Sequence, residues 1–379
     1  MKRFFLFSFM PLLMCPFFAK AQVAFANGDH TFEMGGNLIT GYNYRFYPAG
    51  TTDVHKNSFF LDQARFYFKG RVGGSLRYKM EMDVADLTAD IQTPATPLGF
   101  LKDAYVDYLY KTLMIRTGYQ KIHAYGFNAV VDEIDDPFFQ RPSIASKLNS
   151  RRDLGVTASY WFPYLRLTAI GGIYTGMGEQ VFAVDNTNGK PEFIGRLEYS
   201  YPARNVDEIV SMNDAPYPVF QCGINARYKN GTYTTLADYD LTTIDGKKTC
   251  YGFDASIMYR GFSVQVEAHQ MRVVPNDSTL LYSEGKKYTY FRAGGYLVEL
   301  NYYCRKMKSV FAVRYDELNP NDLIFGNTER TMSYCYNYFI RQNFLCLKAA
   351  YEEHFNLVYP AGTRYKDDEL RVGIQVIFN

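Results

Sequence analysis

The feature that most constrains this chain is a regular alternation of apolar and polar residues along nearly its whole length. Leu76, Tyr78, Met80, Met82 and Val84, for example, alternate with Arg77, Lys79, Glu81 and Asp83. Successive side chains of a β-strand point to opposite faces, so the pattern predicts strands with one apolar and one charged face. Such segments lie near residues 36–47, 62–72, 75–86, 100–111, 112–121, 152–161, 164–176, 191–202, 218–230, 232–242, 248–260, 261–272, 290–303, 308–317, 329–340, 342–354 and 367–378.

Two all-β architectures give this alternation. One is a soluble sandwich or β-helix, and the other is a transmembrane barrel, in which every second side chain faces lipid. The apolar faces are rich in Phe and Tyr, the opposite faces are charged, and the last segment runs to the C-terminus. A final strand that pairs with the first removes the edge that lipid cannot solvate. We therefore predict a transmembrane antiparallel β-barrel.

The N-terminus has the three parts of a secretory signal. Lys2 and Arg3 supply charge, residues 4–18 form a short apolar core, and Ala19-Lys20-Ala21 is a small-residue cleavage site. We expect residues 1–21 to be a signal peptide, 22–35 a short N-terminal segment and 36–379 the barrel. Removing the leader gives a net charge of about −1, which offers no argument for a nucleic acid partner.

The number of strands follows from the segments and from a rule of closure. Seventeen segments are visible, but a bacterial single-chain barrel with both ends on one side has an even number of strands. Sixteen is our prediction, with 18 the next choice, because the region 202–247 is ambiguous. The glycines in 72–75, 229–232 and 260–261 predict tight hairpin turns. The longest outer loop is predicted at about 122–150.

The polar faces of these strands are predicted to line a water-filled lumen. Face by face, the basic residues assigned there are Arg65, Lys69, Arg77, Lys79, Arg116, Arg166, Arg196, Arg227, Arg314 and Arg371. The same faces carry Glu81, Asp83, Asp103, Asp107, Asp153, Glu198, Asp254, Glu267, Glu299 and Glu352. Selectivity needs an uncompensated ring of one sign, so a mixed wall favours a weakly selective pore. For any single arginine, a salt bridge that only stiffens the wall is the alternative.

The loop 122–150 has a sharp contrast of charge. Its candidate residues are Asp132, Glu133, Asp135, Asp136, Arg141 and Lys147, followed by Arg151 and Arg152. They either line a constriction or belong to a solvated outer loop. The carboxylates lack the ordered ligand loop and glycine of a calcium site, so we expect no metal here and no cofactor.

Several of these motifs together resemble the phosphate-selective porin O and P family of outer-membrane channels. They are Ala64-Arg65, Lys69-Gly70, Lys102-Asp103-Ala104-Tyr105-Val106, Gly118 with Lys121, and Arg152-Asp153-Leu154-Gly155, and the resemblance is clearest over 57–165. It implies a 16-stranded barrel, usually a homotrimer, whose third outer loop folds into the lumen, and it adds Lys121 to the pore-lining candidates. This chain has Ile122-His123-Ala124-Tyr125-Gly126 where the family commonly has a proline-containing run, and Asn379 follows Phe378.

The expected function is passive diffusion of small hydrophilic solutes across the outer membrane of a Gram-negative bacterium, with anions such as phosphate as the solutes it would favour. A barrel enzyme that hydrolyses lipid or peptide, or a closed structural barrel, is the alternative. The five histidines stand in no nucleophile or metal motif, so we expect no enzyme. The five cysteines after the leader are an odd number without metal spacing, with Cys222 predicted to face lipid and Cys346 the lumen.

Overall fold

A computed structural model describes residues 23–46, 57–85, 100–148, 151–180, 190–202, 209–212, 217–231, 245–276, 282–283, 286–341, 344–355, 357–358, 364–365 and 368–378. The signal peptide predicted at 1–21 lies outside these residues. In the described part the barrel strands are β2 (His30–Phe46), β3 (Ser58–Val72), β4 (Leu76–Asp83), β5 (Leu101–Tyr110), β6 (Leu113–Lys121), β7 (Arg152–Phe162), β8 (Leu167–Tyr174), β9 (Glu192–Tyr201), β10 (Val219–Asn230), β11 (Gly246–Tyr259), β12 (Phe262–Pro275), β15 (Phe291–Cys304), β16 (Ser309–Asn319), β17 (Glu329–Arg341), β18 (Leu345–Phe355) and β21 (Asp368–Phe378).

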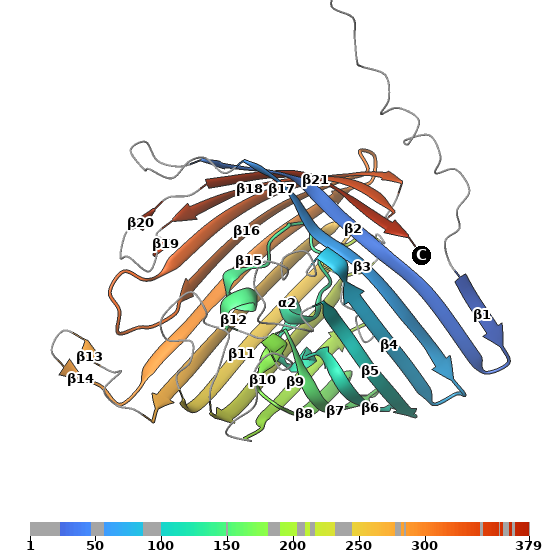
Figure 1. The fold of residues 1–379 in the computed structure, drawn as a ribbon, viewed down its shortest axis with the longest axis horizontal. Coiled ribbons are helices and arrows are strands. Elements are labelled where there is room, and N and C mark those ends of the chain that lie inside the picture. Colours follow the sequence, from blue (N-terminus) through green and yellow to red (C-terminus); the bar gives the residue numbers. More distant parts are fainter. Residues whose placement is uncertain are drawn as a thin grey trace, which may run out of the picture.

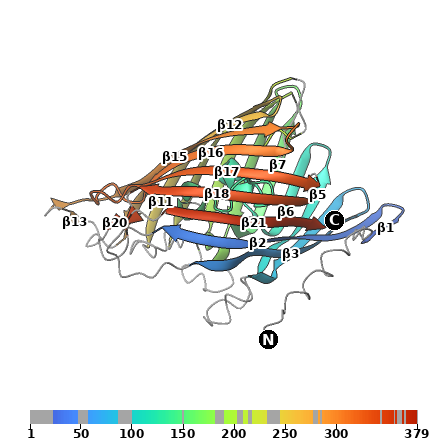
Figure 2. The same ribbon diagram turned by 90° about the horizontal axis from the view of Figure 1, so that it is seen from above.

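These strands form one closed antiparallel barrel of 16 strands, which confirms the predicted fold class and strand number (Figures 1 and 2). Each strand pairs with its neighbours along the chain, and β21 pairs with β2 from Gly36 opposite Phe378 to Phe46 opposite Asp368. The apolar stripe at the C-terminus therefore belongs to the strand that closes the wall. No backbone edge of the barrel is left for lipid to solvate.

The boundary predicted at residue 36 is corrected. The first barrel strand begins at His30, and β1 (Val23–Asn27) pairs with its first residues, Val23 opposite Met34. β1 thus lies along β2 just beyond the point where β21 ends. The sequence hid this extension because the run Gly35-Gly36-Asn37 interrupts the alternation, although it continues the strand.

The region that was ambiguous in the sequence is settled by the pairing of β10. This strand pairs with β9 on one side and directly with β11 on the other. The predicted segment 232–242 lies outside the described residues, and the sheet has no place for another strand between β10 and β11. The tight turn predicted at 229–232 is also wrong, because β11 begins only at Gly246. The turns at 73–75 and 260–261 are confirmed.

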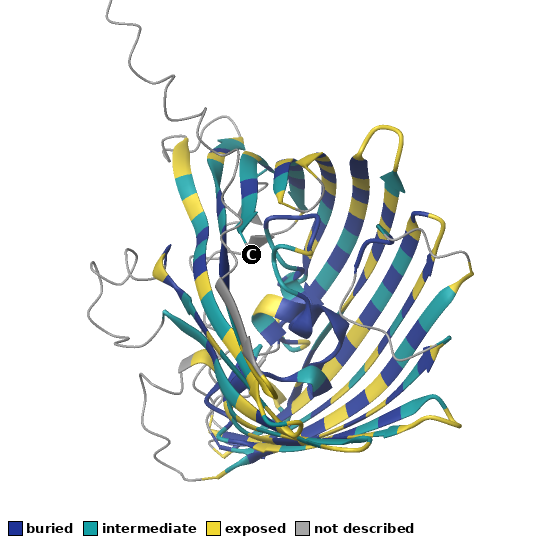
Figure 3. Cartoon of the chain, turned by 90° about the vertical axis from the view of Figure 1, so that its right-hand side faces the viewer, coloured by how far each residue is buried: buried dark blue, intermediate teal, exposed yellow. Residues whose placement is uncertain are grey.

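The two faces of the wall differ as the alternation predicts. Buried and exposed positions alternate along the strands (Figure 3), and large exposed side chains such as Ile224, Leu300 and Phe311 point outward. All ten acidic residues assigned to the lumen are buried. The outward face is therefore the apolar one, as contact with acyl chains requires.

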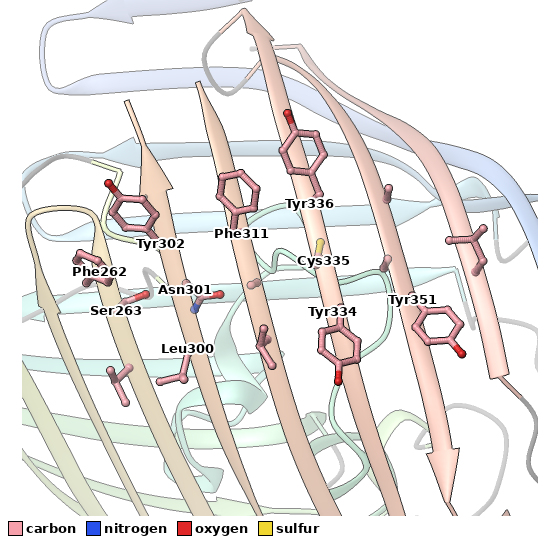
Figure 4. Close-up of a pocket in the computed structure, with 16 residues that line it drawn as sticks. Phe262, Ser263, Leu300, Asn301, Tyr302, Phe311, Tyr334, Cys335, Tyr336 and Tyr351 are labelled. Atoms are coloured by element: carbon pink, nitrogen blue, oxygen red, sulfur yellow. The ribbon is translucent and has the colours of Figure 1, made fainter. Parts of the chain in front are cut away.

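Aromatic residues form a row across the outward face of the barrel. The row lies near the end at which the tight turns 73–75 and 260–261 are found, which we call the short-turn end. Phe262 is opposite Tyr302, Tyr302 opposite Phe311, and Phe311 opposite Tyr336 on neighbouring strands (Figure 4). The Phe262 and Tyr302 rings stack with centroids 4.3 Å apart, and those of Phe311 and Tyr336 are 5.2 Å apart. Such a row is typical of the girdle at one membrane interface.

Helices are short and few in the described residues. They are η1 (His123–Tyr125), α2 (Phe127–Val130), η2 (Ile144–Leu148) and η3 (Gly178–Gln180). Two small hairpins, β13 (Tyr282–Ser283) with β14 (Lys286–Lys287) and β19 (Leu357–Val358) with β20 (Arg364–Tyr365), stand apart from the barrel sheet. None of the described helices has the length and apolar character needed to cross a membrane.

The closing strand gives a first prediction. Deleting residues 368–379 removes β21, so β2 and β18 both lose a partner along their barrel edges. We expect no folded barrel, because unpaired backbone groups in lipid cost several kcal/mol each. The heat-modifiable shift on SDS gels measures folding. Deleting Asn379 alone is the matched control and should leave the shift intact; a folded barrel without β21 would contradict the closure.

Candidate pore constriction

The segment between β6 and β7 first continues the pairing of these two strands and then turns into the barrel. Lys121 is opposite Arg152, and the Ile122 amide donates to the Arg151 carbonyl at 2.9 Å. Residues 123–148 then carry η1, α2 and η2 inside the barrel (Figure 1). Residues Ile122, Tyr125, Phe138 and Ile144 of this loop are buried. The loop therefore occupies the cross-section through which a solute has to pass.

The loop is held to the wall on several sides. The Asn128 amide donates to Glu267 on β12, and the Ser143 amide donates to Asp316 on β16, each at 2.9 Å. Lys147 pairs with Glu329 on β17 at 3.0 Å. On the far side, Lys348 of β18 donates to the Asp136 carbonyl at 2.8 Å and Gln375 of β21 to the Ile134 carbonyl at 2.9 Å. These contacts fix the loop across the lumen.

Glu133 is the centre of the charge arrangement in the loop. Arg65 of β3 donates from Nη1 to Glu133 Oε2 at 2.7 Å, Arg141 Nη2 lies 3.2 Å from Oε1, and Arg151 also pairs with Oε1. Arg65 further contacts Asp83 at 2.9 Å and Glu81 at 3.5 Å. We call Glu133, Arg65, Arg141 and Arg151 the Glu133 clamp. It fastens the loop to the β3 wall by charge-assisted hydrogen bonds.

The clamp holds Glu133 in its ionised form. Burial alone would raise the pKa of the Glu133 carboxyl, but Arg151, Arg141 and Arg65 together hold that pKa well below its usual range. For Asp132, burial again acts to raise the pKa, and Lys121 outweighs it, so the pKa is lowered. Lys121 pairs with Asp132 and donates to the Val130 carbonyl at 2.9 Å. Both carboxylates are thus charged across the physiological range.

The lowered pKa of Glu133 gives a prediction with a definite sign. A carboxyl whose pKa falls on folding stabilises the folded state above its unfolded pKa, near 4.5, and loses that contribution as pH falls towards the folded pKa. The wild type should have a higher Tm than Glu133→Gln. This difference in Tm should have its full size at pH 7 and should shrink below about pH 4.5. Thermal unfolding in detergent measures it. A difference that grows towards pH 3 would contradict the clamp.

Most of the other predicted lumen cations have a carboxylate partner. The pairs are Lys69 with Glu33 at 2.8 Å, Arg77 with Asp107 at 3.4 Å, Lys79 with Asp103 at 2.9 Å, Arg116 with Asp107 at 2.6 Å, Arg152 with Asp103 at 3.1 Å, Arg196 with Glu198 at 3.1 Å, Arg227 with Glu192 at 3.8 Å, Arg314 with Asp136 at 3.8 Å and Arg371 with Glu369 at 3.0 Å. Wall charges therefore largely compensate one another locally.

Arg166 lies outside the lumen to which it was assigned, and Asp135 lies in the predicted loop but takes no part in the clamp. Arg166 is in the turn between β7 and β8, and its guanidinium lies 4.4 Å from the ring centroid of Tyr201, an exposed residue on the outward face of β9. Its assignment to the lumen is corrected, because the left-handed turn at Arg166 (φ 55°) breaks the alternation used to assign it. Asp135 lies in the loop but outside the Glu133 clamp.

An apolar cluster fills the opposite part of the lumen. It joins Phe127, Val131, Phe138 and Phe139 of the loop to inward residues of β2, β16, β17 and β18: Ile39, Val310, Ala312, Cys335, Phe339, Cys346 and Ala350. Ile209 and Val210, from the connection between β9 and β10, complete it, and Gln265 of β12 donates to the Ile209 carbonyl at 3.3 Å. This connection lies at the short-turn end, whereas the loop between β6 and β7 lies at the other end. Segments of the chain therefore enter the lumen from both ends.

Two contributions to the packing inside the lumen were not predicted from the sequence: Lys348, and the pair Ile209 and Val210. Lys348, which holds the loop, shares the lumen face of β18 with Cys346 and Glu352, so alternation alone could have added it to the candidates. Ile209 and Val210 stand in a connection rich in Pro, Asp and Asn, where an isolated apolar pair was the available signal. Their burial depends on contacts with the loop, and no local pattern encodes those contacts.

Beside the β2 to β6 wall, the lumen is hollow. A cavity of about 620 Å³ lies near the short-turn end and is lined by residues of β2 to β6. Its charged lining consists of Lys69, Arg71, Arg77, Lys79 and Arg116 with Glu33 and Asp107. Five cations face two carboxylates, and Lys79 also pairs with Asp103 and Glu81 just outside this lining, so this part of the lumen has a small local excess of positive charge. The Arg116 guanidinium lies 3.8 Å from the Tyr105 ring centroid, which orients it.

The described residues contain little that would support chemistry or metal binding. All five cysteines after the leader are free; Cys346 is buried in the lumen and Cys222 shares the outward face with Ile224, as predicted. His269 pairs with Glu267 at 2.8 Å beneath the loop. Within the described chain, one group, Glu352, His354 and Glu369, has the spacing of metal ligands.

Comparison with known proteins agrees with this geometry. Residues 32–189 match the family of phosphate-selective porins O and P. The chain is similar to the phosphate-selective porins over this segment. The match confirms the resemblance predicted from the sequence. It covers the strands of the β2 to β6 wall and the whole loop between β6 and β7, which are the parts that shape the hollow side of the lumen. Among curated proteins, no sequence matches this chain.

Several solved structures share the fold of this barrel. An anion-selective porin from Comamonas acidovorans is 11% identical, with 92% of this chain and 100% of that chain covered and a TM-score of 0.61. OmpT of Vibrio cholerae in its trimer form is 12% identical (92% and 99%, TM-score 0.57). Salmonella typhi OmpF, in complex with daunomycin, is 15% identical (94% and 100%, TM-score 0.57). At these identities the similarity concerns the fold.

Proposed function

We propose that this protein is an outer-membrane porin through which small hydrophilic solutes diffuse passively, with a weak preference for anions. The observation that carries the proposal is a closed 16-stranded barrel with an apolar outside, a charged inside and a buried loop across its lumen. Transport through such a pore needs no chemical step, so we propose no enzymatic activity and no cofactor. The lipid of a Gram-negative outer membrane is the expected surrounding of its apolar face.

The solute path is proposed to follow the β2 to β6 wall. The opposite side of the lumen is packed by the apolar cluster around Phe138 and Ile209, which leaves a hollow of only about 110 Å³ beside it. The hollow beside Lys79 and Arg116 is polar and charged. A solute coming from the outside would pass the Glu133 clamp and then enter this hollow, so Arg65, Lys79, Arg77 and Arg116 are the proposed pore-lining residues.

The weak preference for anions is argued from the uneven lining of the hollow. Clamp and wall charges are largely paired, so they set up local fields without a ring of one sign. The hollow itself has five cations and two carboxylates. The net attraction for anions is therefore modest, and phosphate would be one of several accepted anions.

Reversal potentials in a KCl gradient test this proposal. We expect a chloride over potassium permeability ratio of about two to five, with partial block by millimolar phosphate. Arg77→Gln, which changes a half-exposed cation of the hollow, should lower the ratio. Arg330→Gln is the control, because Arg330 pairs with Glu317 on the outward face at 2.8 Å. A cation-selective wild type, or equal effects of both variants, would contradict the proposal.

A homotrimer is proposed as the assembly. The outward face of β12 and β15 to β18 is hollowed over about 590 Å³ and lined by Val264, Leu300, Val313, Tyr334 and similar apolar residues (Figure 4). A second copy of the barrel would fill such a groove better than acyl chains would. Cross-linking in native outer membranes followed by mass measurement in detergent tests it: a trimer is expected, and a monomer alone would exclude it.

A further inference from the structure

Three potential ligand residues meet on the lumen face near the outer end of the barrel. Glu352 and His354 are two residues apart on β18, so they share one face, and Glu369 of β21 is directly opposite Glu352. One ligand atom of each lies within 4.8 Å of the others. Zinc ligands at about 2.1 Å in a tetrahedral site are roughly 3.4 Å apart, so side-chain adjustments of about 1 Å would close the site.

Each of the three residues has one atom that could still coordinate a metal ion. Glu352 is 2% exposed, and its Oε1 is buried with no hydrogen-bond partner in the described structure, while its Oε2 lies 2.9 Å from the amide group of the Gln140 side chain. Glu369 takes its bonds on Oε1, from Arg371 at 3.0 Å, from Arg45 at 3.5 Å and from Asn43, which leaves Oε2 as its candidate ligand atom. An unpaired buried carboxylate oxygen is costly unless a cation reaches it.

The imidazole of His354 is oriented for coordination. Its Nδ1 lies 3.1 Å from the hydroxyl of Thr331, the residue opposite it on β17. When Nδ1–H donates to that hydroxyl, the lone pair is on Nε2, which is 3.8 Å from Glu352 Oε2. A ligating histidine held by a hydrogen bond from its other nitrogen is the usual arrangement around a protein metal.

The charges around the group favour an added cation. Two carboxylates directly opposite on neighbouring strands repel each other, and Arg371 and Arg45 reach only Oε1 of Glu369. Arg314 is occupied by the Gln140 carbonyl, Asp136 and Glu299, and Lys147 by Glu329. Asp316, opposite Thr331, adds a further carboxylate near the group.

We propose that Glu352, His354 and Glu369 bind a divalent first-row transition metal of the zinc class at the outer mouth of the pore. One imidazole and two carboxylates suit such a metal, whereas calcium and magnesium prefer an all-oxygen set. The fourth position faces the lumen and is left for water. Because the Gln140 side chain of the loop lies 2.9 Å from Glu352, bound metal would add positive charge beside the loop. The sequence alone predicted no metal, since the two strands that supply the ligands meet only in the folded barrel.

Calorimetric titration of the folded protein in detergent with ZnCl₂ tests the proposal without any measurement of transport. We expect one site per chain with micromolar affinity, and at least about tenfold weaker binding for His354→Ala and for the isosteric Glu352→Gln. Thr331→Val, which changes only the residue that orients His354, should weaken binding by about tenfold. His30→Ala is the control, because His30 is exposed at the start of β2, at the short-turn end of the barrel.

The outcomes separate cleanly. Folding of each variant is checked by its heat-modifiable shift, so a loss of binding in a folded variant supports the site. Absence of binding by the wild type at 1 mM Zn²⁺, or equal affinities for His354→Ala and His30→Ala, would overturn the proposal. Either result leaves the porin function standing, because conductance is measured separately.

Discussion

Glu133→Gln is expected to raise the chloride over potassium permeability ratio of the pore about five- to tenfold, which corresponds to roughly 1 to 1.4 kcal/mol. The substitution removes the one negative charge that Arg65, Arg141 and Arg151 share in the clamp. Three guanidinium groups would then remain where the loop crosses the lumen, with a net gain of one positive charge there. Reversal potential in a KCl gradient measures the change.

The matched control for this variant is Glu317→Gln. It makes the same chemical change and also breaks an ion pair, between Glu317 and Arg330, but on the outward face. Its permeability ratio should equal that of the wild type. If Glu133→Gln left selectivity unchanged, the clamp would lie off the conduction path, and the proposed route along the β2 to β6 wall would be wrong.

Excising the constriction loop is expected to raise single-channel conductance at least about twofold. Ile122 and Arg151 form a backbone hydrogen-bonded pair, so replacing residues 123–150 with Asn-Gly leaves a two-residue hairpin between β6 and β7. The wall residues that held the loop, including Lys348 and Asp316, would then face water in a wider lumen and keep their solvation. Conductance steps in planar bilayers measure the gain.

Shortening a different outer loop is the control for the excision. Residues 320–328 between β16 and β17 are held by a bond from Asn327 to the Asn321 carbonyl and by one from the Arg292 amide of β15 to Asp322, each at 2.8 Å. Replacing them with Asn-Gly should leave the conductance near that of the wild type. Conductance unchanged by removal of 123–150, in a barrel shown to be folded, would mean that this loop does not set the constriction.

The wall of the barrel was predictable because the alternation encodes it residue by residue. Phe66 and Met80 face out while Arg65 and Glu81 face in, and one rule of period two is enough to assign them. Closure was predictable as well, since the C-terminal stripe needs a partner strand. The rule failed where the backbone leaves the strand geometry, as at Arg166, or where glycines obscure it, as at the start of β2.

The inside of the lumen was much less predictable. The charges of the loop were visible in the sequence, but the convergence of Arg65, Arg141 and Arg151 on Glu133 depends on how residues 123–148 cross the barrel. The contribution of Ile209 depends on contacts with Phe138 and Phe339, far away in the chain. Long-range packing of this kind has no local period, so only the fold brings these residues together.

We propose that a continuous water path runs through this barrel past the Glu133 clamp. The most direct measurement is the single-channel current of the purified wild-type protein in a planar bilayer with KCl. We predict discrete, stable conductance steps with weak anion selectivity. Folded protein that inserts into the bilayer and yields no steps would show that the loop and the connection around Ile209 close the lumen, and it would contradict the account.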